Sequence, residues 1–271
     1  MNARLTLVAH ASTAATARAL FSRDEGLEPR GAAAAGAASA PRRITRAVCS
    51  PARAAVETAG ALGLAATVDP GLADWHLGEW RGRALDEIAA AHPADVAAWL
   101  ADPDAAPHGG ESLTALLARV AGWLAGAGMS AGPDGAAGAW GSGGSTGRAG
   151  LTGAWGSGGS AAGAGAGGSG GGAASAGARG SGGSAAEVGS AAGAVPAAGA
   201  GPAGGAALAH TVAVTHAAVV RAAVVVTLGA PPAGFWRIDV APLTATLLRG
   251  GPGRWTVRST ALPLDPSPGG R

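Results

Sequence analysis

A long tract of small residues in the middle of the chain restricts the fold more than any other feature. Between Gly126 and Gly205 the sequence consists almost entirely of glycine, alanine and serine. Such a stretch has too little branched apolar surface to offset the entropy lost on ordering, so we predict that residues 127–207 are a disordered insertion. The octapeptide GAWGSGGS occurs twice within it, at residues 138–145 and 153–160, which is typical of a duplicated low-complexity tract.

The segments on either side of this tract are long enough to build one domain. Residues 1–126 and 208–262 are predicted to form its first and second parts, because the entropic cost of closing a loop rises only slowly with loop length. Residues 263–271 are expected to be a disordered tail.

Charge and cysteine content exclude several classes of protein. The 19 basic and 17 acidic side chains give a formal net charge of +2, so neither nucleic acid nor an anionic membrane is an expected partner. Cys49 is the single cysteine, so an intrachain disulfide is excluded and nothing indicates an oxidising compartment. No apolar run reaches the length of a signal-peptide core or a spanning helix. We therefore expect a cytoplasmic protein.

Three segments repeat the same order of a short apolar run, a small polar loop and a helix. The apolar runs are Leu5–Val8, Ala47–Cys49 and Thr211–Val214. Ser50 and Pro51 are expected to cap the helix after the second run, and residues 217–228 are the helix expected after the third. Repeated strand–loop–helix units predict an α/β fold, three-layer α/β/α, with a mainly parallel sheet.

Further periodic segments complete the expected secondary structure. Helical spacing of apolar residues occurs at residues 32–40, 84–91, 95–100 and 111–124. Short runs at residues 235–240, 244–248 and 255–258 are expected to close the chain as antiparallel strands at or near the sheet edge.

Two histidines directly follow predicted parallel strands. His10 comes after LTLVA and His216 after VAVT. The carboxyl ends of such strands line a common crevice, so the two imidazoles are expected to converge although they are far apart in the sequence. A single histidine there is more often a loop or core residue, but two, each followed by small residues, indicate a shared anion site. Ala217 would add the N-terminus of a helix to that site.

Asp74 lies in the segment GLADWHLGEWRG, whose glycines predict a loop. A carboxyl group beside two imidazoles is suited to protonating the leaving oxygen of a phosphate ester. The local sequence agrees equally well with a turn or helix cap. The role of Asp74 therefore stays open at this point.

Five motifs occur in the order found in the histidine phosphatase superfamily. They are LTLVAHAST at 5–13, SPARAAVETA at 50–59, LADWHLGEWRG at 72–82, PHGGES at 107–112 and VTHAAVVRA at 214–222. Over nearly all of its length outside the glycine-rich tract the chain resembles branch 1 of this superfamily, the phosphoglycerate mutase-like proteins.

The resemblance implies a phosphatase-type hydrolase acting on a small phosphorylated metabolite. His10 matches the nucleophile that becomes phosphohistidine, His216 the second histidine that stabilises the phosphoryl group, and Asp74 the proton donor. Thr13 and Thr16 fall in the phosphate-binding loop. Neither a metal ion nor an organic cofactor is required.

The resemblance also implies two arginines that this chain lacks. Ala9 stands where one is expected directly before the nucleophile, and Ala54 where the other is expected four residues before Thr58. Arg53, one residue out of register, is the candidate replacement in phosphate binding, although a one-residue shift turns a helical side chain by about 100°. It agrees as well with a surface arginine in a salt bridge. Losing two charged partners would lower the rate by roughly two to four powers of ten.

Three functions therefore remain open. The first is hydrolysis through His10, with weak activity. The second is a catalytically degenerate pseudophosphatase that binds an anion or a protein partner. The third assigns the function to the glycine-rich tract as a binding or self-association segment. Substrate identity and oligomeric state are not determined by the sequence.

Overall fold

The structure is a computed structural model that describes residues 3–126, 209–251 and 253–266. The insertion predicted at residues 127–207 lies outside these described residues, and so does the part of the predicted tail from residue 267 onward.

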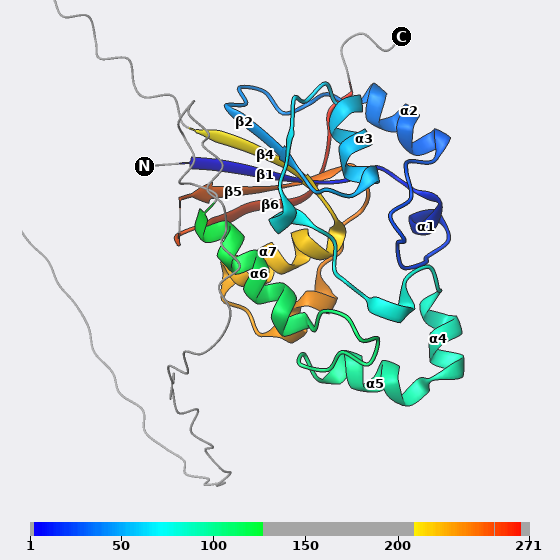
Figure 1. Ribbon diagram of the computed structural model, residues 1–271. Helices are drawn as coiled ribbons and strands as arrows, with labels where there is room; N and C mark the ends of the chain where they lie inside the picture. Colours follow the sequence, from blue (N-terminus) through cyan, green and yellow to red (C-terminus); the bar gives the residue numbers. More distant parts are fainter. Residues whose placement is uncertain (1–2, 127–208, 252, 267–271) are drawn as a thin grey trace, which may run out of the picture. The chain divides into compact units, whose positions relative to one another are not determined.

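A six-stranded sheet forms the centre of the described fold (Figure 1). Its strands are β1 (Ala3–Ala9), β2 (Arg46–Cys49), β3 (Thr67–Val68), β4 (His210–Thr215), β5 (Thr244–Gly250) and β6 (Thr256–Pro263). The order across the sheet is β3-β2-β4-β1-β5-β6. The first four of these strands run parallel, whereas β5 is antiparallel to β1 and β6 is antiparallel to β5.

The position of β4 between β1 and β2 in the sheet determines where the site forms. In the β1–β4 register Ala9 lies opposite Thr215. The residues that follow, His10 and His216, therefore leave the sheet from adjacent positions at the same edge. The predicted convergence of these two segments is confirmed.

Helices cover both faces of the sheet (Figure 1). They are α1 (Ala14–Ala17), α2 (Pro29–Ala37), α3 (Arg53–Ala61), α4 (Leu85–Ala91), α5 (Pro93–Ala101), α6 (Leu113–Gly126) and α7 (Ala217–Leu228). Figure 1 shows α2 and α3 on one face, and α6 and α7 on the other. Among the described residues none of these helices is both long and apolar enough to cross a membrane.

The alternation of side chains along β1 produces two apolar cores. Leu5 and Leu7 point into the core shared with α6 and α7, whereas Val8 packs with Ala55 and Ala59 of α3. The larger core also contains Trp99 of α5, and Figure 1 shows α4 and α5 beyond the carboxyl end of β1. The three-layer α/β/α fold with a mainly parallel sheet is thus confirmed.

Two predictions about the C-terminal part are wrong. Residues 235–240 do not form a strand, because a 3₁₀ helix, η3 (Pro232–Arg237), begins after Pro231 and buries Phe235. The disorder expected from residue 263 does not apply to residues 263–266. Pro263 belongs to β6, and the Asp265 carbonyl accepts a hydrogen bond of 2.7 Å from the Ser39 N–H.

Candidate active site

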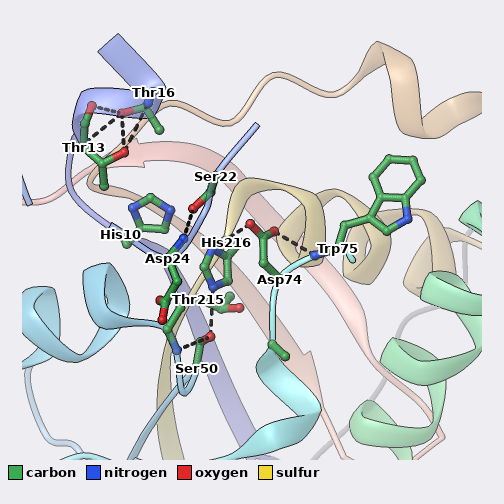
Figure 2. A network of polar contacts seen from close by, with 12 residues as sticks. His10, Thr13, Thr16, Ser22, Asp24, Ser50, Asp74, Trp75, Thr215 and His216 are labelled. Carbon is green, nitrogen blue, oxygen red and sulfur yellow. Dashed lines mark hydrogen bonds and ion pairs between the residues drawn. The ribbon is translucent and has the colours of Figure 1, made fainter. Parts of the chain in front are cut away.

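The rings of His10 and His216 lie in contact at the carboxyl edge of the sheet. Their centroids are 4.9 Å apart and their planes are inclined by 71°, an edge-on arrangement (Figure 2). The His10 N–H donates to the Thr215 carbonyl at 2.8 Å, so the β1–β4 ladder extends into the site. His216 is the N-cap residue of α7, which has the bounds predicted for it. Both imidazoles are therefore positioned by regular secondary structure.

His10 is oriented by its own neighbour in the chain. Its Nδ1 lies 2.8 Å from the Ala11 carbonyl oxygen. Because a carbonyl oxygen can only accept, Nδ1 carries the proton in this bond, and Nε2 of the neutral ring keeps its lone pair. That nitrogen has the electronic state required of a nucleophile.

His216 is buried between two polar partners. Its Nε2 lies 2.9 Å from the Ser50 hydroxyl oxygen, and its Nδ1 lies 3.3 Å from Asp74 Oδ2. The second contact is close enough for an ion pair but is not aligned as a hydrogen bond. Burial lowers the pKa of His216, while the nearby Asp74 carboxylate partly opposes this effect. The neutral ring is consequently favoured in the folded protein.

Asp74 lies in the loop between two short 3₁₀ helices, η1 (Pro70–Leu72) and η2 (Gly78–Trp80). Its Oδ1 accepts a 2.8 Å hydrogen bond from the Trp75 N–H, which leaves Oδ2 directed toward His216 (Figure 2). Figure 2 shows His216 between His10 and Asp74. The Asp74 side chain thus binds the local backbone through Oδ1 and faces His216 through Oδ2.

Arg119 of α6 stabilises the backbone of this loop. Its guanidinium forms two hydrogen bonds with the Glu111 carboxylate, at 2.8 and 2.9 Å. The same group donates to the carbonyls of Gly71, Ala73 and Asp74 at 3.0–3.3 Å. The bidentate pair and three carbonyl bonds fix the backbone on which Asp74 stands.

A cavity of about 290 Å³ opens beside His216 and Asp74. Its described lining residues are Ser22, Asp24, Ser50, Pro51, Ala52, Ala73, Asp74, Trp75, His76, Arg81 and His216. His10 is not among them, but its ring contacts the ring of His216, which is. In the part of the chain that the structure describes, no group of three or more histidine, cysteine or acidic side chains is arranged to hold a metal ion.

Thr13 and Thr16 use their hydroxyls to begin α1. The two side chains form a reciprocal capping box, and the Thr13 hydroxyl also donates to Glu25 at 3.0 Å. Neither threonine lines the cavity beside His216. Their part in phosphate binding remains a prediction.

Arg53 lies at the surface in this arrangement. Its Nε donates to Glu57 at 2.7 Å, and its side chain is 68% exposed. Binding of phosphate by Arg53 would require this i,i+4 pair to open. The backbone N–H of Arg53 instead binds Asp24 Oδ1 at 2.8 Å. Ala9 and Ala54 are both buried and bring no polar group to the site.

A comparison with protein-family models identifies the family. The model of the histidine phosphatase superfamily, branch 1, matches residues 5–135 and 194–262, more than half of the chain. This chain belongs to that superfamily. His10, His216 and Asp74 all fall within the matched ranges.

Curated relatives within the superfamily match part of the chain. A glucosyl-3-phosphoglycerate phosphatase of Mycolicibacterium vanbaalenii is 41% identical over 85 residues, 30% of this chain and 38% of the relative. The protein of the same name from Mycobacterium tuberculosis is 42% identical over 76 residues, 27% of this chain and 34% of the relative. The chain therefore matches little more than a third of the length of these relatives.

Solved structures of the superfamily share the fold. A structure described as mycobacterial hydrolase 1 has a TM-score of 0.64 at 22% identity, covering 97% of this chain and all of the other. The native mycobacterial glucosyl-3-phosphoglycerate phosphatase has a TM-score of 0.60 at 22% identity, covering 96% and 99%. A putative α-ribazole-5′-phosphate phosphatase of Escherichia coli has a TM-score of 0.60 at 16% identity, covering 97% of this chain and 99% of the other.

Three residues of the site, Ser50, Arg119 and Arg81, were not predicted from the sequence. Ser50 was interpreted as a helix cap, but α3 begins at Arg53 with Ala52 as N-cap, and the Ser50 hydroxyl contacts His216. Its position just after β2, at the same edge as the histidines, was the signal that could have identified it. No comparable signal marked Arg119 or Arg81, because their surroundings arise from tertiary packing.

Proposed function

We propose that this chain is a phosphatase-type hydrolase that removes the phosphoryl group from a small phosphorylated metabolite through a phosphohistidine on His10. The observation that carries the proposal is the edge-on contact of His10 and His216, 4.9 Å between centroids, with Asp74 on the other side of His216. Membership of the superfamily and the names of the phosphatase relatives support it.

The first step forms the phosphoenzyme. Nε2 of His10 attacks phosphorus, the N–P bond forms and the P–O ester bond breaks in line with it. Asp74 gives its proton to the departing alcohol oxygen. His216 donates to a phosphoryl oxygen, and the N-terminus of α7 at Ala217, where no side chain provides a cap, adds backbone N–H groups to the same anion.

The second step regenerates the enzyme. Water attacks phosphorus, the N–P bond breaks, and the Asp74 carboxylate accepts the proton that water loses. Phosphate then leaves and His10 is neutral again. All proton transfers use groups of this chain, so the scheme contains no metal ion or organic cofactor.

Weak activity follows from the loss of two arginines that the superfamily pattern implies. Ala9 and Ala54 occupy the positions where the superfamily pattern implies arginines, and Arg53 is paired with Glu57. Each missing charged hydrogen bond would cost about 1.5–3 kcal/mol of transition-state stabilisation. The pseudophosphatase alternative receives no support from the relatives, which are named as phosphatases.

Phosphate release from an aryl phosphate and a panel of phosphorylated metabolites tests this function. The wild type should exceed His10→Ala in rate, whereas His92→Ala, an exposed histidine away from the cavity, should match the wild type. The same background rate for wild type and His10→Ala would refute hydrolysis through His10 and favour a binding role. The cytoplasmic location and the boundaries of the insertion remain predictions.

A further inference from the structure

The cavity beside His216 needs a cation if it is to hold a phosphate ester. Two arginines near the site have other partners: Arg53 pairs with Glu57, and Arg119 binds Glu111 and three carbonyls. Arg81 is the arginine among the described residues that line the cavity. Arg81 was not predicted as a site residue from the sequence, but its contacts in the structure place it in the cavity wall.

Residues 21–23 hold Arg81 in place. Its Nε donates to the Ser22 carbonyl at 3.3 Å, and its own carbonyl accepts from Arg23 Nε at 3.0 Å. The Gly82 N–H donates to the Phe21 carbonyl at 2.6 Å, so the two segments run together along the wall of the cavity. Within the described residues no hydrogen-bond partner is recorded for the two terminal nitrogens of Arg81. The guanidinium is therefore anchored at one end and available at the other.

Two carboxylates line the same cavity. Asp74 faces His216, and Asp24 lies on the opposite segment with Oδ1 bound to the Arg53 N–H. The Asp24 N–H donates to the Ser22 hydroxyl at 3.1 Å, which fixes this residue beside the segment of Arg81. In the state that starts the reaction Asp74 carries the proton for the leaving group, so the charged groups of this lining are Arg81 and Asp24. Arg81 can pair with one anionic group, and Asp24 would repel a second.

We infer that the cavity takes a phosphate monoester of an uncharged polyol, with Arg81 binding the phosphoryl oxygens and Asp24 accepting hydrogen bonds from hydroxyl groups of the organic part. This inference rests on the proposed function and names its substrate class. A guanidinium matches the phosphoryl oxygens bidentately. A carboxylate beside the organic part favours hydroxyl groups and disfavours a second carboxylate.

Calorimetric binding to the full chain with His10→Ala, which prevents turnover, tests the inference. Glycerol 3-phosphate and 3-phosphoglycerate make a matched pair, because they differ by a hydroxymethyl group in place of a carboxylate. Glycerol 3-phosphate should bind about tenfold more tightly. Adding Arg81→Gln should weaken its binding about 10- to 100-fold, and Arg81→Lys should restore part of the loss. Arg83→Gln, whose partner is the exposed Glu87, is the matched control and should change nothing.

Asp24→Asn tests the preference for an uncharged organic part. It removes the negative charge, while the amide oxygen can still accept from the Arg53 N–H. This variant should strengthen the binding of 3-phosphoglycerate about tenfold and narrow the preference. Tighter binding of 3-phosphoglycerate by the His10→Ala chain, or an unchanged Kd in Arg81→Gln, would overturn the inference. A different result would refute the proposed function alone. In that case the wild type, with His10 intact, releases no phosphate from either ester, while the Kd differences appear as expected.

Discussion

The Ser50 hydroxyl lies 2.9 Å from Nε2 of His216, on the side of the ring away from the nitrogen that faces Asp74. Ser50 is fully buried, and its oxygen also accepts from the Ala52 N–H at 3.2 Å. The serine thus fixes the rotation of the His216 ring about its long axis. It connects the start of α3 to the histidine at the start of α7.

Ser50→Ala should therefore impair catalysis more than stability. Loss of the hydroxyl removes one hydrogen bond, about 1 kcal/mol of unfolding free energy, but lets the His216 ring reorient. We expect a fall in kcat of about tenfold or more, with an altered pH profile, whereas KM changes little. Ser259→Ala on β6, whose hydroxyl donates to the Arg258 carbonyl, is the control. An unchanged kcat and pH profile in Ser50→Ala would show that His216 does not depend on this contact.

Arg119→Gln should reduce both stability and activity. The substitution leaves the half-buried Glu111 without its partner and releases three loop carbonyls, which we expect to cost roughly 1–3 kcal/mol in urea denaturation. The Asp74 loop should loosen and kcat should fall, with partial recovery in Arg119→Lys. The surface pair of the partly buried Arg83 and the exposed Glu87 provides the comparison, because Arg83→Gln should cost less than about 0.5 kcal/mol. Similar losses in the two variants would contradict the role assigned to Arg119.

Acidification should destabilise the fold through three buried histidines. Burial lowers the pKa of His108, His210 and His216. Their unfolded forms, with a pKa of about 6.5, bind protons more readily than their folded forms. The stabilisation is therefore complete above about pH 6.5 and is lost as the pH falls through the lowered folded values. The free energy of unfolding should decrease by at most about 1.4 kcal/mol per pH unit for each histidine.

Substitution of His108 provides the check on this pH dependence. His108 is 1% exposed and lies among Trp75, Trp80 and Trp99. His108→Gln should flatten the decrease below about pH 6.5, whereas His92→Gln, at an exposed position, should leave it unchanged. A stability that stays constant on acidification in the wild type would argue against neutral, buried histidines.

Deletion of residues 132–204 should leave fold and activity intact. The elements that flank the tract contact each other directly, since α6 and α7 share one core and the Trp255 Nε1–H donates to the Leu124 carbonyl at 3.0 Å. Loop closure costs change little with length, so the melting temperature and phosphate release should be close to those of the full chain. Loss of solubility, or a change of oligomeric state measured by light scattering, would instead favour a function for the tract itself.

The sequence predicts those parts of the site that follow from the sheet. His10 and His216 are predictable because each ends a buried parallel strand, and the carboxyl ends of parallel strands share one edge. Arg119 is not, because its partners come from two other segments and no local pattern encodes that contact. Residues 235–240 were misinterpreted because apolar residues in a short run resemble a strand, while the preceding prolines impose a 3₁₀ turn.

The most direct test of the account is detection of phosphohistidine at His10. Wild-type protein is mixed with a phosphate ester, quenched within milliseconds under alkaline conditions that preserve phosphohistidine, and analysed by peptide mass spectrometry. We predict that the phosphoryl group is found on the peptide containing His10, and that it is absent together with turnover in His10→Asn. Turnover that persists in His10→Asn, or a phosphoryl group carried by a different residue, would contradict the account.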